Sequence, residues 1–325
     1  TRAHRGASKM RPRFAIRARK AALVLLATII LAGCTQASTT SESFGPFAPD
    51  SPFRTPIPDD AVIDPNSQAM VARISQDDAL YANLIAYSIP VYHASEGTPR
   101  RTVECTRNWG ACPFDNLTVP IPDDAEPSPG SDGALVVVDP ATRQLFEFWQ
   151  AEDHGADGWT TSWGAIADLD GDGWTVQEHS TASGASRLGG VILVSEIQQG
   201  EIPHALALQA ENTCVDIFRS PATRTDGTST RPDCIPEGAL VRLDPAVDLD
   251  SLDLAPAVRM VAEAMQTYGG YIVDRGSAPL SVSFERDTTA TSNRSIGTAY
   301  EDAGLRWDYD DLPGVPWDRL QVLAP

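Results

Sequence analysis

The sequence predicts a mainly β protein, a β-sandwich or jelly roll with two accessory helices in a single domain. Short apolar runs bounded by Gly, Pro and Asp recur along most of the chain, as strands joined by turns do. Only two segments carry apolar side chains at the three-to-four-residue spacing of an amphipathic helix. Many short strands with two helices favour packed sheets over an alternating α/β fold.

The two helices are predicted at residues 67–87 and at residues 254–268. Asn66 or Ser67 suits the start of the first, in which apolar side chains recur at helical spacing: Met70, Val71, Ile74, Tyr81, Leu84 and Ile85. In the second, Pro256 suits the first turn, and Gly269 and Gly270 end a stripe of Leu254, Val258, Val261 and Met265.

Strands are expected in eight apolar runs between and after the helices. These are residues 134–138, 145–150, 159–167, 190–194, 205–209, 239–243, 271–274 and 280–284. The last segment, residues 307–323, is aromatic and contains proline, and we expect it to pack back on a sheet.

The N-terminal 33 residues predict a signal peptide, with Met10 as the true start. Five basic residues, Arg11, Arg13, Arg17, Arg19 and Lys20, precede a largely apolar run of twelve residues, 21–32, which is shorter than the ~20 that span a bilayer. Leu31-Ala32-Gly33-Cys34 resembles the lipobox of bacterial lipoproteins. This resemblance implies that Cys34 is lipidated, with the bilayer as partner and the extracytoplasmic face of the cell membrane as location. Residues 34–56, rich in Ser, Thr and Pro, predict a flexible tether to a β-rich domain at 57–325.

The charge of the predicted mature chain is strongly negative. Residues 1–33 hold eight of the 25 Lys and Arg and no Asp or Glu, so 17 basic and 44 acidic side chains remain, a net charge of −27. Such a surface repels nucleic acid, which we therefore exclude as a partner. The scarcity of lysine is typical of a high-GC genome and favours an actinobacterial source.

Four cysteines remain once Cys34 is assigned to lipid, and an even number in an exported protein predicts disulfides. Three connectivities are possible. We expect Cys105–Cys112 and Cys214–Cys234, because each pair brackets a turn-rich segment. Closing these loops corresponds to roughly 2.5 and 3.3 kcal/mol of stabilisation. The alternative is four buried free thiols.

One loop carries the spacing of a calcium site. Asp168, Asp170 and Asp172 alternate, and Gly173 at the sixth position permits a sharp turn. The closing acid, Glu178, comes one place early, because His179 holds the twelfth position. Ca²⁺ is thus a possible cofactor, and the alternative is a solvated turn rich in Asp and Gly.

The run 145–150 suggests a glycan cleft. On a strand, Phe146 and Phe148 share one face, and Glu147 and Trp149 share the other. If the phenylalanines are core, a carboxylate and an indole stand together on an accessible surface, as in a polysaccharide cleft. Trp159, Trp163 and Trp174 follow closely. The alternative is that these aromatic rings fill a core and Glu147 pairs with an arginine.

Three further residues are candidates for the same site. His204 precedes an apolar strand and is either a tuned acid or base or a structural histidine. Asp226 lies in the hydroxyl-rich segment 223–230 inside the expected Cys214–Cys234 loop, which suits ligand contact or a plain surface hairpin. Asp274 follows an apolar run and is either a second carboxylate for Glu147 or a turn residue.

From residue 139 onward the chain also resembles a group of uncharacterised secreted bacterial proteins. The stretches that carry this resemblance are 146–149, 183–200, 204–206, 235–238 and 268–274. It implies no activity and no catalytic residues.

Our leading hypothesis is a lipoprotein that binds or cleaves envelope or external polysaccharide. In it Glu147 is the acid/base, His204 or Asp274 its partner, and Trp149 and Asp226 contact the sugar. The alternatives are a non-catalytic binding or scaffold lipoprotein and a calcium-stabilised structural domain. Motifs of nucleotide-binding proteins, zinc proteases and serine hydrolases do not occur in the predicted mature chain.

Overall fold

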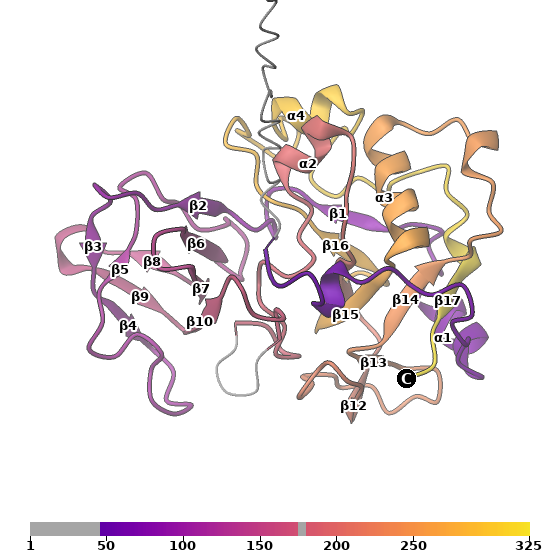
Figure 1. The fold of residues 1–325 in the computed structure, drawn as a ribbon, viewed down its shortest axis with the longest axis horizontal. Coiled ribbons are helices and arrows are strands. Elements are labelled where there is room, and N and C mark those ends of the chain that lie inside the picture. Colours follow the sequence, from indigo (N-terminus) through magenta and orange to yellow (C-terminus); the bar gives the residue numbers. More distant parts are fainter. Residues whose placement is uncertain (1–45, 175–179) are drawn as a thin grey trace, which may run out of the picture. The chain divides into compact units, whose positions relative to one another are not determined.

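A computed structural model describes residues 46–174 and 180–325 (Figure 1). This part of the chain is mainly β, as predicted, with strands in several sheets and four α-helices, of which two exceed seven residues. The predicted signal peptide, Met10, Cys34, Glu178 and His179 lie outside the described residues. In the part that the structure describes, no helix has the length and apolar character needed to span a membrane.

The largest sheet has six strands of mixed direction. Their order is β1 (Tyr81–Asn83), β16 (Ser281–Ser283), β11 (Leu206–Ala210), β15 (Gly270–Arg275), β14 (Leu240–Leu243) and β17 (Leu320–Val322). Helix α3 (Pro256–Thr267) packs on this sheet and buries Val258, Val261 and Met265 against Leu206 and Val241 in a first hydrophobic core. Three of the four residues of the predicted apolar stripe lie on this helix, whereas Leu254 precedes it. The predicted docking of the C-terminal segment is confirmed, since its strand β17 forms a sheet edge.

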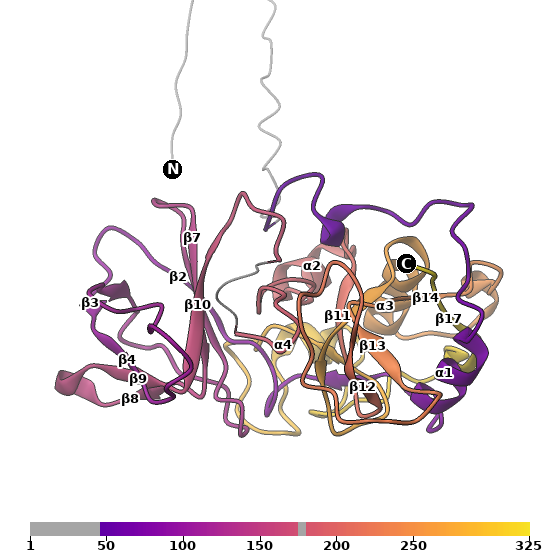
Figure 2. The same ribbon diagram turned by 90° about the horizontal axis from the view of Figure 1, so that it is seen from below.

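A four-stranded sheet lies beside the larger one in both views (Figures 1 and 2). Its order is β10 (Trp163–Asp168), β7 (Gln144–Trp149), β6 (Leu135–Asp139) and β2 (Val91–His93). Side chains alternate between its faces. Val136, Val138 and Leu145 share a second core with Ala207 and Val273 of the six-stranded sheet. The opposite face, with Phe146 and Phe148, belongs to a third core.

Smaller elements surround these sheets. They are strands β3 (Arg100–Arg101) with β5 (Val119–Pro120), strands β4 (Val103–Cys105), β9 (Trp159–Thr161) and β8 (Glu152–Asp153), strands β12 (Thr213–Phe218) with β13 (Ile235–Glu237), and helices α1 (Ser67–Ile74), α2 (Val194–Gln199) and α4 (Thr298–Asp302). Both predicted disulfides, Cys105–Cys112 and Cys214–Cys234, are present.

The first helix is shorter than predicted, because it ends at Ile74 instead of continuing to residue 87. The Ser75 amide and hydroxyl both donate to the Val71 carbonyl and close the last turn, and Asp78 has a positive φ of 49°. Tyr81–Asn83 then forms strand β1. The strand expected at 190–194 is also wrong, since Ile192 makes only an isolated bridge to Phe284 before α2 begins.

Residues 46–56 are not the flexible tether that their Ser and Pro content predicts. Phe47 and Phe53 are 3% and 1% exposed and lie in the second core, against Gly173 and Gly189. A 3-10 turn at Pro52–Arg54, capped by the Ser51 hydroxyl, places the Phe53 ring. Burial of two aromatic rings outweighs the polar composition here, so the folded domain begins before residue 57.

Candidate functional site

A cleft of about 840 Å³ is lined by residues of both large sheets. Three kinds of side chain meet in it. Tryptophans come from the four-stranded sheet and a disulfide loop, amide and hydroxyl groups come from the six-stranded sheet, and carboxyl groups come from the end of β15 and from the middle of the Cys214–Cys234 loop. A concave surface of this size that combines aromatic and convergent polar groups is the usual form of a ligand site.

The aromatic wall of the cleft consists of Trp109, Trp149 and Trp163. Trp149 and Trp163 are direct cross-strand partners on β7 and β10, on the face opposite Phe148. Trp109 stacks on Trp149 with the ring centroids 5.8 Å apart and an interplanar angle of 17°, and it lies 5.8 Å from Trp163. Trp109 is 62% exposed, so much of this indole is accessible from the cleft.

The Cys105–Cys112 disulfide holds Trp109 in this wall. The tryptophan lies inside the loop that this disulfide closes, and the loop begins at the end of β4. The Arg107 guanidinium lies 5.9 Å from the centre of the Trp109 ring, a cation–π contact from within the same loop. A short covalent loop limits the rotation of an exposed indole and therefore lowers the entropy that stacking would otherwise lose.

The polar floor of the cleft consists of Asn83, Gln209, Ser281 and Ser283. They stand on β1, β11 and β16, whose neighbouring residues Leu208 and Val282 face the first core instead. The Asn83 side-chain amide and the Ser281 hydroxyl both donate to the side-chain oxygen of Gln209, at 3.2 and 3.1 Å. The side-chain nitrogen of Gln209 donates in turn to the Ser283 hydroxyl at 2.9 Å. The strand alternation thus presents a connected row of amide and hydroxyl groups to the cavity.

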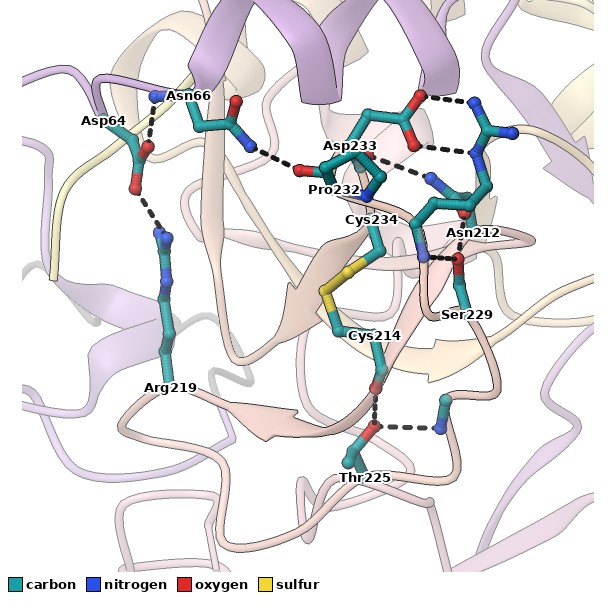
Figure 3. Close-up of a disulfide and its surroundings, with 12 residues drawn as sticks. Asp64, Asn66, Asn212, Cys214, Arg219, Thr225, Ser229, Pro232, Asp233 and Cys234 are labelled. Carbon is teal, nitrogen blue, oxygen red and sulfur yellow. Dashed lines mark hydrogen bonds and ion pairs between the residues drawn. A yellow bond between two sulfur atoms is a disulfide. The ribbon is translucent and has the colours of Figure 1, made fainter.

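Asp226 lines the cleft from within the loop that the Cys214–Cys234 disulfide closes. Figure 3 shows this disulfide and the hydrogen bonds around it. The Thr225 hydroxyl donates to the Cys214 carbonyl and accepts from the Gly227 amide, which fixes the turn. A Cβ at Gly227 would lie 2.1 Å from the Cys214 carbonyl oxygen, so only glycine permits this close approach. The Ser229 hydroxyl donates to Asn212 at 2.6 Å and fastens the far side of the loop.

A second carboxyl, Asp274, lines the cleft from β15, and a third, Glu237 on β13, lies fully buried behind Asp226. Burial, together with the charges of Asp226 and Asp132, raises the pKa of Asp274 to about 7, against the opposing effect of Arg187. Burial, a hydrogen bond with Asp226 and the charge of Asp274 raise the pKa of Glu237 to about 10. At neutral pH Glu237 therefore carries a proton.

Glu147 does not stand on an accessible surface, and this part of the prediction is wrong. Its face opposes Phe146 and Phe148 as expected, but the segment 180–187 covers it and leaves its side chain 0% exposed. The carboxylate accepts from the Ser180 and Ser186 hydroxyls and from the Arg187 amide at 2.9 Å. The three residues that donate to Glu147 line the cleft, whereas Glu147 itself does not.

His204 is also a structural residue and not a catalytic partner in the cleft. It is 8% exposed and lies 3.1 Å from the Glu196 carboxylate, which accepts in turn from the Leu193 amide at the start of α2. Burial acts to lower the pKa of His204, but the charge and hydrogen bond of Glu196 outweigh it and raise the pKa. The histidine and glutamate satisfy each other away from the cleft lining.

The described part of the Asp168 loop does not assemble the predicted calcium site. The Asp170 carboxylate is bound by the Arg143 guanidinium, which lowers the pKa of that carboxyl. Asp168 and Asp172 accept from amides of their own turn, at Asp170 and Trp174. Over residues 46–174 and 180–325, no three His, Cys, Asp or Glu side chains lie close enough to hold a metal ion.

Of the residues singled out in the sequence, the structure therefore brings Trp149, Asp226 and Asp274 together in one cleft, with Trp163 beside them. Trp159 and Trp174 pack in the third and second cores instead. Sequence reasoning missed Trp109, Glu237 and Arg187. A tryptophan inside an eight-residue disulfide loop, where no core can form, was the available signal for Trp109.

Comparison of the chain with models of protein families, with curated proteins and with solved structures finds no match. The site must therefore be interpreted from its own chemistry.

Proposed function

We propose that the cleft binds a segment of a glycan chain. The observation that carries this proposal is the stacked Trp109–Trp149 pair facing the same cavity as the amide and hydroxyl floor. A sugar ring has apolar C–H faces, which suit indole, and an equator of hydroxyl groups, which require paired donors and acceptors. Few other ligand classes need both surfaces at once.

The rest of the cleft lining also suits a sugar ligand. Tyr81, Tyr87 and Tyr309 line the cavity in addition to the tryptophan wall. The carboxylates Asp132 and Asp226 are acceptors for sugar hydroxyls. Arg224 and Arg275 line the same cavity and offset the charge of its acidic residues. The cavity is therefore less negative than the predicted mature chain as a whole, whose net charge is −27, and it is compatible with a neutral polysaccharide.

Trp149→Ala is expected to weaken glycan binding at least tenfold, because truncating a central stacking tryptophan costs about 2 kcal/mol or more. The measurement is isothermal titration of cellohexaose, chitohexaose, xylohexaose and mannohexaose into the purified domain, with tryptophan fluorescence as a second signal. Trp109→Ala should show the same loss.

Phe218→Ala is the matched control, since Phe218 is a 44% exposed aromatic residue outside the cleft lining. Its affinity should equal that of the wild-type chain. If none of the four hexasaccharides binds the wild-type domain, or if both tryptophan variants bind as tightly as it does, the glycan proposal is wrong.

We further propose that the chain is a lipoprotein anchored through Cys34 at the extracytoplasmic face of the membrane. The lipobox sequence supports this, and the two disulfides fit an oxidising compartment. In a bacterial host that processes lipoproteins, the wild-type chain should partition into the detergent phase of Triton X-114. Cys34→Ser should move it to the aqueous phase, and equal partitioning of the two would refute the anchor.

A further inference from the structure

The acidic end of the cleft is built from carboxyl groups in two layers. Asp226 and Asp274 line the cavity, whereas Glu237 lies behind them and is 0% exposed. The Asp226 backbone hydrogen bond acts to lower the pKa of Glu237, but burial, the Asp226 side chain and the charge of Asp274 outweigh it. The hydrogen-bonding neighbour of Glu237 is another carboxyl, Asp226, so the contact needs a proton on one of the two groups.

The environment assigns that proton to Glu237, the more deeply buried of the two acids. A protonated Glu237 donates to Asp226 and leaves Asp226, which is exposed to the cleft, as an acceptor. Asp274 faces the charges of Asp226, Asp132 and Arg187 and also has a raised pKa, about 7. One cleft-lining carboxyl, Asp226, is thus exposed and hydrogen-bonded to Glu237, and the other, Asp274, is held as an acid up to neutral pH. Two carboxyls in such different environments on one cavity are the arrangement that acid–base catalysis uses.

Arg187 gives an independent indication of a ligand at this end. The side chain is 7% exposed and lines the cleft, and its terminal nitrogen donates to the Ser180 carbonyl. Its Nε–H has no acceptor within the described residues. A buried guanidinium donor without an acceptor is costly unless a bound molecule supplies the oxygen. Proton transfer is the chemistry that two neighbouring carboxyl groups offer.

We infer that the cleft hydrolyses a glycosidic bond of the glycan it binds, with Asp274 as proton donor and Asp226 as base. This inference rests on the proposed glycan binding. Asp274 gives its proton to the glycosidic oxygen as the bond from that oxygen to the anomeric carbon breaks. A water molecule forms the new bond to the anomeric carbon and gives a proton to Asp226. Transfer of that proton back to Asp274 through solvent restores the site, and one water is consumed per bond.

The test compares hydrolysis and binding in the same variants. Wild-type domain is incubated with the four hexasaccharides at pH 6, and new reducing ends are counted. In H₂¹⁸O the labelled oxygen should appear in the hydroxyl group on the anomeric carbon of the new reducing end. Asp274→Asn and Asp226→Asn should each lower kcat by about 10²–10⁴-fold and change the Kd less than threefold. Asp60→Asn, an exposed loop residue outside the cleft, should leave both unchanged.

Two failures are distinguishable. Binding of a hexasaccharide without any release of reducing ends overturns the hydrolysis and leaves the glycan-binding proposal standing. Absence of binding overturns both. Hydrolysis that persists in Asp274→Asn, with a circular dichroism spectrum like that of wild type, shows that another group donates the proton.

Discussion

Replacing Glu147 by leucine is expected to lower the free energy of unfolding by about 3–5 kcal/mol. The substitution removes the acceptor for two serine hydroxyls and the Arg187 amide at a position with no solvent access. The hydroxyls can rotate toward other partners, but the amide cannot, so at least one buried donor stays unpaired. Urea denaturation at pH 7 measures the difference.

Glu104→Leu on β4 is the matched control, because Glu104 is an exposed strand residue, and its effect should stay within about 0.5 kcal/mol. Glu147→Gln keeps one acceptor oxygen and should lie between the leucine variant and wild type. If Glu147→Leu unfolds at the wild-type urea concentration, the network is not structural. A fully stable Glu147→Gln that loses hydrolysis would restore Glu147 as a catalytic residue.

Glu147 also shows how far strand alternation predicts a site. The pattern correctly placed Phe146 and Phe148 on one face and Glu147 and Trp149 on the other, because period-two alternation is a local property of the backbone. What covers a face depends on chain that is remote in sequence. Arg187, 40 residues away, donates to Glu147 and converts an expected surface carboxylate into a buried one.

The mainly β class was predictable for the same local reason, and the errors fall where tertiary contacts override it. Leu84 and Ile85 continue the helical spacing of residues 70–74, yet they follow a strand and are buried in the first core. Phe47 and Phe53 fold a segment whose composition indicates a tether. In both cases burial of a few apolar side chains outweighs the local preference.

The cleft was predictable only in parts. Trp149, Asp226 and Asp274 could be selected as residue types suited to sugars. Trp109 and Asp226 lie in the same cleft because two separate disulfide loops contribute to its lining. No spacing in the sequence indicates that these two loops share one cleft. Glu237 carries no sequence signal at all, since its role depends on burial against another carboxyl.

The second large effect concerns Glu237. Glu237→Gln is expected to raise the free energy of unfolding by roughly 5 kcal/mol at pH 8. The wild-type carboxyl has a pKa of about 10 in the folded protein and about 4.5 unfolded, so folding at pH 8 must keep a proton that the unfolded chain releases. Glutamine has nearly the same shape, bears no ionisable proton and still donates an N–H to Asp226, so it folds without that penalty.

The size of the stabilisation by Glu237→Gln depends on pH, which separates it from a packing effect. Because its pKa is raised in the folded state, Glu237 contributes fully to the free energy of unfolding below about pH 4.5. This contribution is lost as the pH rises toward 10. The advantage of Glu237→Gln should therefore be near zero at pH 4 and grow steadily through pH 6 and 8 in urea titrations. Glu301→Gln, an exposed substitution, should show no such growth. An advantage that is equal at pH 4 and pH 8 would mean that Glu237 is ionised in the folded chain and cannot donate to Asp226.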